Sequence, residues 1–241
     1  MSNPIAVGTQ AQTSAGSSVA PSITGTTGET LVALVSWIDV SSSTATALSV
    51  PAGWTAAYNP TGFASVGNGR GGLACFFKTA AGGSESCTIN TPGSAGSFYA
   101  NAILYRYAAG MTHDTADAPA TTINNAAAST TGVTVPDTNT LSGANSAVLT
   151  GVSIFAGTGL ANAAIAFSGG SWTTDLSDQD TSVSVGSLFG HKSVSATTPL
   201  NAVYTWTSDA SMFCYQAAVV VFSDAGGGGG GSVPLMGQAC L

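Results

Sequence analysis

The apolar residues of this chain come in short runs that are separated by clusters of Gly, Pro, Asn and Ser. The runs are rich in Val, Ile, Thr, Phe and Tyr, a composition typical of β-strands. No segment carries an apolar stripe at helical spacing with capping residues at both ends. The pattern therefore predicts an all-β protein. The predicted strands are residues 19–24, 30–40, 45–50, 55–58, 72–79, 86–89, 98–107, 132–135, 146–155, 172–175, 182–189, 202–206 and 213–223.

The alternation within these runs indicates which strands have one wet face. Residues 86–89 and 182–185 alternate between apolar and polar positions, as expected of a strand that covers a core on one side only. Residues 31–35 and 218–222 are apolar throughout. Such strands are either central in the fold or covered on their outer face by a neighbouring subunit.

The chain also repeats itself with a period of about 116 residues. Four segments correspond in the same order, namely 29–37 with 145–153, 51–54 with 169–172, 71–78 with 185–192, and 102–107 with 217–222. A sheet needs a second apolar face to cover it, which favours two packed antiparallel sheets. We therefore predict a jelly-roll-like antiparallel β-sandwich over residues 18–225, built from two related halves, about 18–110 and 132–225. The two sheets are either shared by both halves or formed once in each.

Both ends of the chain differ from this region. Residues 1–17 are predicted to be an N-terminal extension. The stretch 226–231 is six consecutive glycines, which is the composition of a flexible linker, and an apolar segment follows it. We predict that residues 226–241 form an assembly arm that binds a neighbour through Val233, Leu235, Met236 and Leu241. The alternative is a tail that docks on its own domain.

The charge content narrows the range of partners. The 241 residues include 4 Lys plus Arg and 11 Asp plus Glu, so that only 6% are charged and the net charge is −7. About 25% is usual for soluble domains. A basic surface for nucleic acid or for an anionic membrane cannot be built from so few cations. No basic residue precedes Arg70, which disfavours a secretory leader and favours synthesis and use without export.

The reactive side chains form no recognisable catalytic pattern. The only histidines are His113 and His191, no G-x-S-x-G elbow occurs, and the only glutamates, Glu29 and Glu85, lie beside turns. The acidic loop Asp175, Asp178 and Asp180 lacks the glycine and the distal glutamate of a calcium loop. The sequence thus predicts no enzyme, no cofactor and no catalytic or metal-binding residues.

Two residue pairs remain as candidates for a structural or binding role. Cys75 and Cys87 lie symmetrically about the turn at 80–83, so a hairpin could place them at disulfide distance; the alternative is two buried thiols in a reducing compartment. Trp54 and Trp172 follow glycine-bearing turns at matching places of the repeat. An exposed indole there could stack on a sugar ring, whereas a buried one would cap the end of the sandwich.

Several motifs resemble those of β-sandwich proteins encoded in the structural-gene regions of tailed bacteriophages. They are the Pro-Ala-Gly-Trp turn at 51–54, the aromatic strand that ends at Lys78 and leads into residues 79–85, and the aromatic strand that ends near Gly110. The resemblance covers about residues 18–225. It implies a virion structural protein, made in the host cytoplasm, such as a capsid decoration protein or a head or tail fibre component. Its partners would be other virion proteins and copies of itself, without nucleic acid or membrane. The alternative function is a glycan-binding adhesin that uses Trp54 or Trp172 on host surface polysaccharide.

Overall fold

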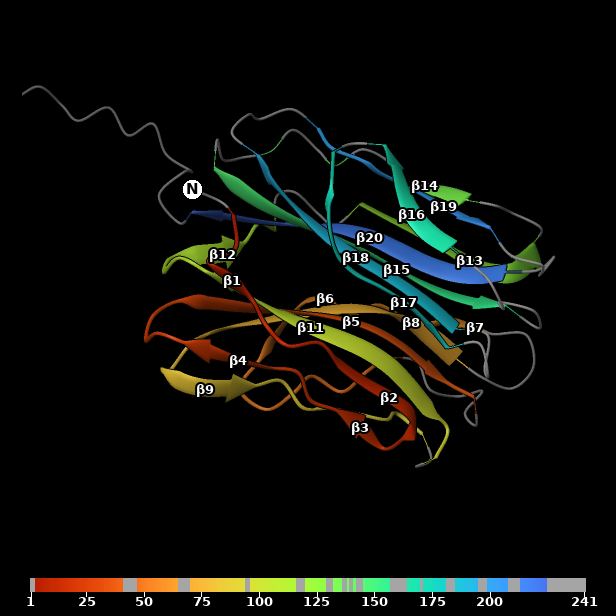
Figure 1. Cartoon of the computed structure of the whole chain (residues 1–241), viewed down its shortest axis with the longest axis horizontal. Helices are drawn as coiled ribbons and strands as arrows, with labels where there is room; N and C mark the ends of the chain where they lie inside the picture. Colours follow the sequence, from red (N-terminus) through yellow and green to blue (C-terminus); the bar gives the residue numbers. More distant parts are fainter. Residues whose placement is uncertain are drawn as a thin grey trace, which may run out of the picture.

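The chain folds into antiparallel β-sheets that are stacked in layers (Figure 1). The computed structural model describes residues 3–40, 47–64, 70–93, 96–115, 120–128, 132–135, 138, 141, 145–156, 164–169, 171–180, 185–194, 199–207 and 213–224. These residues form strands, turns and bends and contain no helix, so no helix in them could cross a membrane. The prediction of a sandwich-like all-β fold is confirmed.

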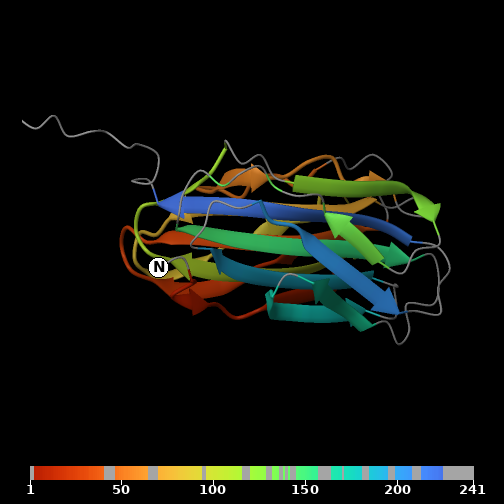
Figure 2. The same cartoon turned by 90° about the horizontal axis from the view of Figure 1, so that it is seen from above.

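Two large sheets form the middle of the molecule, and their strands run along its long axis (Figure 2). The first has the order β1 (Ala6–Val7), β11 (Phe98–Tyr107), β5 (Thr30–Asp39), β8 (Arg70–Thr79) and β6 (Thr55–Tyr58), with β2 (Ala11–Gly16) also on β11 and β7 (Phe63–Ala64) also on β8. The second has the order β12 (Met111–His113), β20 (Phe213–Asp224), β15 (Ser146–Ala156), β18 (Val185–Val194) and β17 (Thr173–Asp180), with β13 (Ala120–Ala128) also on β20.

Smaller sheets cover the outer faces of the large ones. Two strand pairs lie on the first large sheet: β3 (Ser18–Val19) with β10 (Ile89–Asn90), and β4 (Ser22–Gly25) with β9 (Gly83–Ser86). On the second lies a sheet of order β14 (Gly132–Val135), β19 (Ala202–Thr207) and β16 (Ala164–Gly169). Figure 1 shows these small sheets at the bottom and top of the stack.

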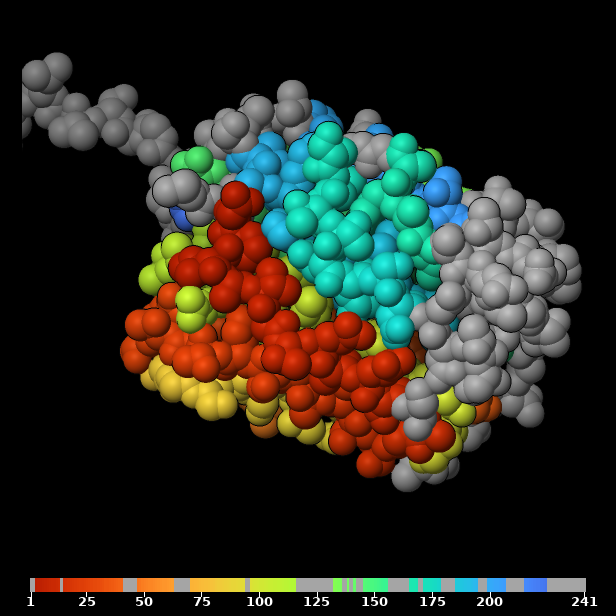
Figure 3. All heavy atoms as spheres, in the orientation of Figure 1, coloured from red at the N-terminus to blue at the C-terminus, as the bar shows by residue number. Residues whose placement is uncertain are grey.

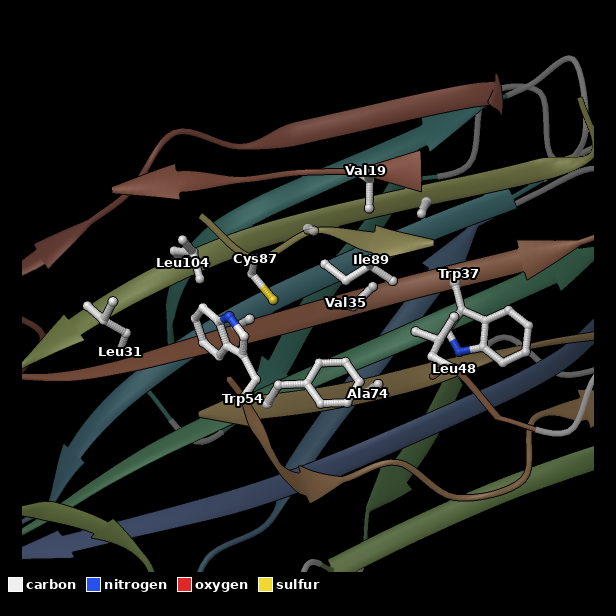
Figure 4. Packing of buried hydrophobic residues seen from close by; sticks show 14 of the residues in the cluster. Val19, Leu31, Val35, Trp37, Leu48, Trp54, Ala74, Cys87, Ile89 and Leu104 are labelled. Atoms are coloured by element: carbon white, nitrogen blue, oxygen red, sulfur yellow. The ribbon is translucent and has the colours of Figure 1, made fainter. Parts of the chain in front are cut away.

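Each large sheet is therefore buried on both faces. In β5, Val32 and Leu34 face the second large sheet, whereas Leu31, Ala33 and Val35 face the small strand pairs. Figure 4 shows Leu31 and Val35 in this outer cluster. The same alternation holds in β20, where Val220 belongs to the core between the large sheets, which we call the central core. The runs 31–35 and 218–222 are apolar throughout because the same chain covers both of their faces. A neighbouring subunit is not needed to explain them.

Two parts of the sequence interpretation differ from the structure: the N-terminal extension and the strand at 45–50. The region predicted as an N-terminal extension contains β1 and β2, which pair with β11. The predicted strand at 45–50 is wrong over residues 47–50, which form no strand. Leu48 is nevertheless buried, and its carbonyl accepts a hydrogen bond from Asn59 Nδ2 at 2.7 Å. A side chain supplies the bond here that a strand partner would otherwise supply.

Candidate functional site

The predicted assembly residues Val233, Leu235, Met236 and Leu241 lie outside the described residues. The assembly arm stays a prediction based on composition.

Trp54 is built into the outer core of the first large sheet. Its backbone N–H donates to the Pro51 carbonyl at 3.0 Å, and Gly53 adopts a φ of 78°, which closes the tight turn. The indole is 7% exposed and lies close to Cys87 (Figure 4), and Lys78 Nζ is 5.2 Å from its ring centroid. A sugar could stack on this ring only after Lys78 and the core residues had moved. Glycan binding at Trp54 stays a prediction that this geometry does not favour.

Lys78 is held over Trp54 by Glu85. Its ammonium group lies 2.5 Å from Glu85 Oε2, and the Ala81 backbone N–H donates to Glu85 Oε1 at 2.7 Å. The hydrogen bond from Lys78 is the main reason why the pKa of Glu85 is lowered, and the backbone donors add to it. One of the two glutamates thus has a structural role at the β8–β9 turn.

Trp172 is half-buried and directly precedes β17. Its ring stacks on Phe167, with the centroids 5.9 Å apart and the planes at 24°, and it packs against the core beneath β16 and β19. Its Nε1 finds no hydrogen-bond partner among the described residues. Trp172 therefore has at least one face occupied by the protein itself.

Cys75 and Cys87 are free thiols, so of the two possibilities that the sequence left open the disulfide is not formed. The hairpin on which that possibility depended does not exist, because β9 pairs with β4 rather than returning along β8. Cys75 consequently faces the central core, while Cys87 faces the outer core on the other side of the sheet. The structure has the two buried thiols of the alternative interpretation.

Neither thiol should react with iodoacetamide in the folded protein at pH 8. Burial raises the pKa of Cys87 to about 12 and raises that of Cys75 even further, so the thiolate population is negligible. Mass spectrometry of a Cys214→Ala, Cys240→Ala variant should show no label before unfolding and two labels in guanidinium. Rapid labelling of the native variant, or a mass 2 Da lower before reduction, would contradict the structure.

A buried polar cluster joins the two large sheets at one edge. Asp175 on β17 accepts a hydrogen bond from Tyr105 Oη on β11 at 2.9 Å, and His191 Nδ1 on β18 lies 2.8 Å from the same carboxylate oxygen. Tyr105 is fully buried, and the Asp175 and His191 side chains are 5% and 13% exposed. The register of β17 against β18 shifts between Thr174 and Leu176, so Asp175 occupies an irregular position. Such irregularities redirect side chains, and here the carboxylate points at Tyr105.

The electrostatics of this cluster keep its phenols neutral. Burial, and after it the negative charge of Asp175, raises the pKa of both Tyr105 and Tyr107 well above 10. Tyr105 therefore acts as a hydrogen-bond donor at neutral pH. The hydrogen bond from Tyr105 on one large sheet to Asp175 on the other connects the two sheets, and His191 binds the same carboxylate.

The other histidine lies in an aromatic setting on β12. The His113 ring is 6.0 Å from Phe77 and 5.7 Å from Phe222, measured between centroids. Burial lowers its pKa, and the charge of Asp114 opposes this only in part. In the unfolded chain the pKa returns to about 6.5, so below that pH the unfolded state binds the proton more readily and the native state loses stability.

His113→Phe should therefore remove part of the loss of stability on acidification. The urea midpoint of the wild type should fall more between pH 7.5 and pH 5 than that of the variant, because phenylalanine fits the aromatic contacts and takes up no proton. The comparison cancels the contribution of other groups that titrate in both proteins. Equal falls in the two proteins would show that His113 is not desolvated.

The prediction of an acidic loop is wrong, because Asp175, Asp178 and Asp180 lie in strand β17, where the first two make contacts within the chain. Asp175 belongs to the cluster just described, and Asp178 accepts a hydrogen bond from Gln12 Nε2 at 2.8 Å, where N-terminal residues meet β17 on one face of the molecule (Figure 3). The side chain of Asp180 lies outside the described part. Across the described ranges, no three His, Cys, Asp or Glu side chains are grouped so that they could hold a metal ion.

Comparison with known proteins adds no relative. No protein-family model matches the chain, and neither a curated protein nor a solved structure matches it.

Proposed function

We propose that the protein is a structural component of a tailed-phage virion, either a capsid decoration protein or a head or tail fibre component, and that it acts by subunit packing. The observation that carries the proposal is the charge-poor all-β build, with 6% charged residues on stacked sheets. Burying neutral polar surface between subunits costs less than burying charges. The likeness of the turn at 51–54 and of the aromatic strands to phage sandwich proteins supports the same function.

We also propose that the fold consists of two related halves. The orders β11-β5-β8-β6 and β20-β15-β18-β17 correspond strand by strand. β11 also pairs with β1 and β2, and β20 also pairs with β12 and β13, in each case two strands from the segment that precedes the half. This correspondence supports an internal duplication. The jelly-roll-like description of each half stays a prediction.

The strand registers support the duplication at the level of single residues. Thr55 lies opposite Phe77, and Thr173 lies opposite His191, so that Trp54 and Trp172 precede corresponding positions. Lys78 lies opposite Leu31, and Lys192 lies opposite Val148, so that Leu31 corresponds to Val148, one residue beyond the counterpart that the alignment of 29–37 with 145–153 predicts. In both sheets the register then shifts by one residue, between Ala56 and Tyr58 of β6 and between Thr174 and Leu176 of β17.

Particle purification tests the virion proposal against the adhesin alternative. Mass spectrometry of particles from cells that carry the gene should find the chain in a fixed ratio to the major capsid or tail protein after a density gradient and a high-salt wash. A glycan array probed with the pure protein should remain negative. If the chain is absent from washed particles and binds polysaccharide in a manner that Trp172→Ala abolishes, the adhesin function replaces ours.

A further inference from the structure

Five buried polar side chains form a band across the central core. They come from five strands of the two large sheets and are Ser36, Asn101, Ser153, Ser187 and Gln216, each at most 6% exposed. We call this set the polar layer. On one side lies the central core, and on the other lies a smaller apolar cluster of Ile38, Phe155 and Val185 with Tyr99. The polar layer is thus enclosed by apolar residues along the strand direction.

The strand registers bring these five residues together. Ser36 is the cross-strand partner of Asn101 in the first large sheet, and Ser153 is the partner of both Ser187 and Gln216 in the second. Side chains of direct cross-strand partners are neighbours on one face of a sheet. Asn101 Nδ2 then donates across the interface to Ser187 Oγ at 3.2 Å. The two rows therefore face each other.

Gln216 makes the reciprocal connection from the second sheet to the first. Leu73 N donates to Gln216 Oε1 at 2.6 Å, and Gln216 Nε2 donates to the Thr61 carbonyl at 3.3 Å. Leu73 lies between the stretch of β8 that pairs with β6 and the stretch that pairs with β7. At this position neither short strand supplies an acceptor, so the Gln216 side chain accepts the hydrogen bond from the Leu73 backbone N–H. A Cβ on Gly72 would come within 2.7 Å of Gln216 Oε1, so a larger residue at position 72 would displace the amide.

Three oxygen atoms of the polar layer remain without a hydrogen bond in the described part of the protein. They are Ser36 Oγ, Asn101 Oδ1 and Ser153 Oγ, and all three are fully enclosed. Buried polar atoms in proteins are almost always satisfied, by protein groups or by ordered water. Three such atoms in one layer indicate a binding site for a small hydrogen-bonding molecule.

We propose that the polar layer is a hydrated site, in which buried water bridges Ser36, Asn101 and Ser153 across the two large sheets. Asn101 Oδ1 can only accept a hydrogen bond, whereas each serine hydroxyl can donate or accept. Water satisfies such a mixed set, and buried waters typically make about three hydrogen bonds. None of the five side chains carries a charge, which favours water over a cation. The apolar residues on both sides slow the escape of this water.

A crystal structure of the full chain at high resolution tests the site directly. We expect density at about 2.7–3.2 Å from at least two of the three oxygens, the spacing of hydrogen-bonded water. Direct hydrogen bonds among the three side chains, with no density between them, would overturn the proposal. Density surrounded by four or more oxygens at about 2.3–2.6 Å, the spacing of a bound cation such as calcium, would overturn the assignment to water.

Magnetic relaxation dispersion of the water nuclei provides a test in solution. The Ser36→Ala, Ser153→Ala double variant should lose at least one long-lived water relative to the wild type. Thr30→Val is the matched control, because the Thr30 hydroxyl is also buried but donates to the Met111 carbonyl at 2.8 Å outside the layer. An equal number of long-lived waters in the wild type and the double variant would count against the site. If the double variant does not fold, the wild-type crystal structure still decides.

Discussion

Asp175→Ala should lower the free energy of unfolding by about 2–4 kcal/mol, the range for removing one partner of a buried charged hydrogen-bonded group. The substitution leaves the Tyr105 hydroxyl fully buried without its acceptor and removes the carboxylate from His191. Because Tyr105 belongs to one large sheet and Asp175 to the other, the substitution lowers the stability by weakening the contact between the sheets. Urea unfolding followed by tryptophan fluorescence measures it.

Asp178→Ala is the matched control for that substitution. Asp178 lies on the same strand and accepts its hydrogen bond from Gln12 at an exposed position. Its loss should change stability by no more than about 0.5 kcal/mol. Tyr105→Phe should fall between the two, because Asp175 then keeps His191. Equal effects of Asp175→Ala and Asp178→Ala would show that the buried cluster does not hold the sheets together.

Deleting residues 226–241 should weaken assembly at least tenfold and leave the melting temperature nearly unchanged. Ordering the backbone of a flexible arm costs on the order of 1 kcal/mol per residue, so the arm should become fixed only when a neighbour buries its apolar side chains. Burial of each large apolar side chain contributes about 1.5–3 kcal/mol. Since 1.4 kcal/mol corresponds to a factor of ten in Kd, losing even one such contact weakens assembly about tenfold. Light scattering after size exclusion measures assembly, and calorimetry measures stability.

A full-length variant separates the apolar contacts from the length of the arm. Replacing Val233, Leu235, Met236 and Leu241 by serine should reduce assembly as much as the deletion does. A deleted protein that no longer melts cooperatively but assembles normally would mean that the tail completes its own domain. The arm hypothesis would then be wrong.

The sequence was most informative where a strand's own side chains determine its burial. The long strands β5, β8, β11, β15, β18 and β20 were all predicted, because each carries a run of apolar residues. β2 and β13 were not predicted, since their sequences AQTSAG and ATTINNAAA are small and polar. Both lie on the open edges of β11 and β20. The unpaired backbone of a neighbour, rather than a local pattern, makes these segments into strands.

The polar contacts between the sheets could not be predicted from local patterns. Tyr105 and Asp175 are 70 residues apart in the chain, and Leu73 and Gln216 are 143 apart. The local sequence predicts that Asp175 lies in an acidic loop, and the repeat predicts that His191 takes the place of Phe77. Their pairing follows from how the two large sheets stack and from the register shift in β17. Only the tertiary structure contains that information.

The most direct test of virion packing is a cryo-electron microscopy reconstruction of the particle that contains this chain. It identifies the neighbours of the chain and traces residues 226–241. We expect the chain to lie against copies of itself and against other virion proteins, with Leu235 and Met236 seated on a neighbour. A particle that lacks the chain, or one in which its sandwich contacts only saccharide while the tail folds onto its own domain, would contradict the account.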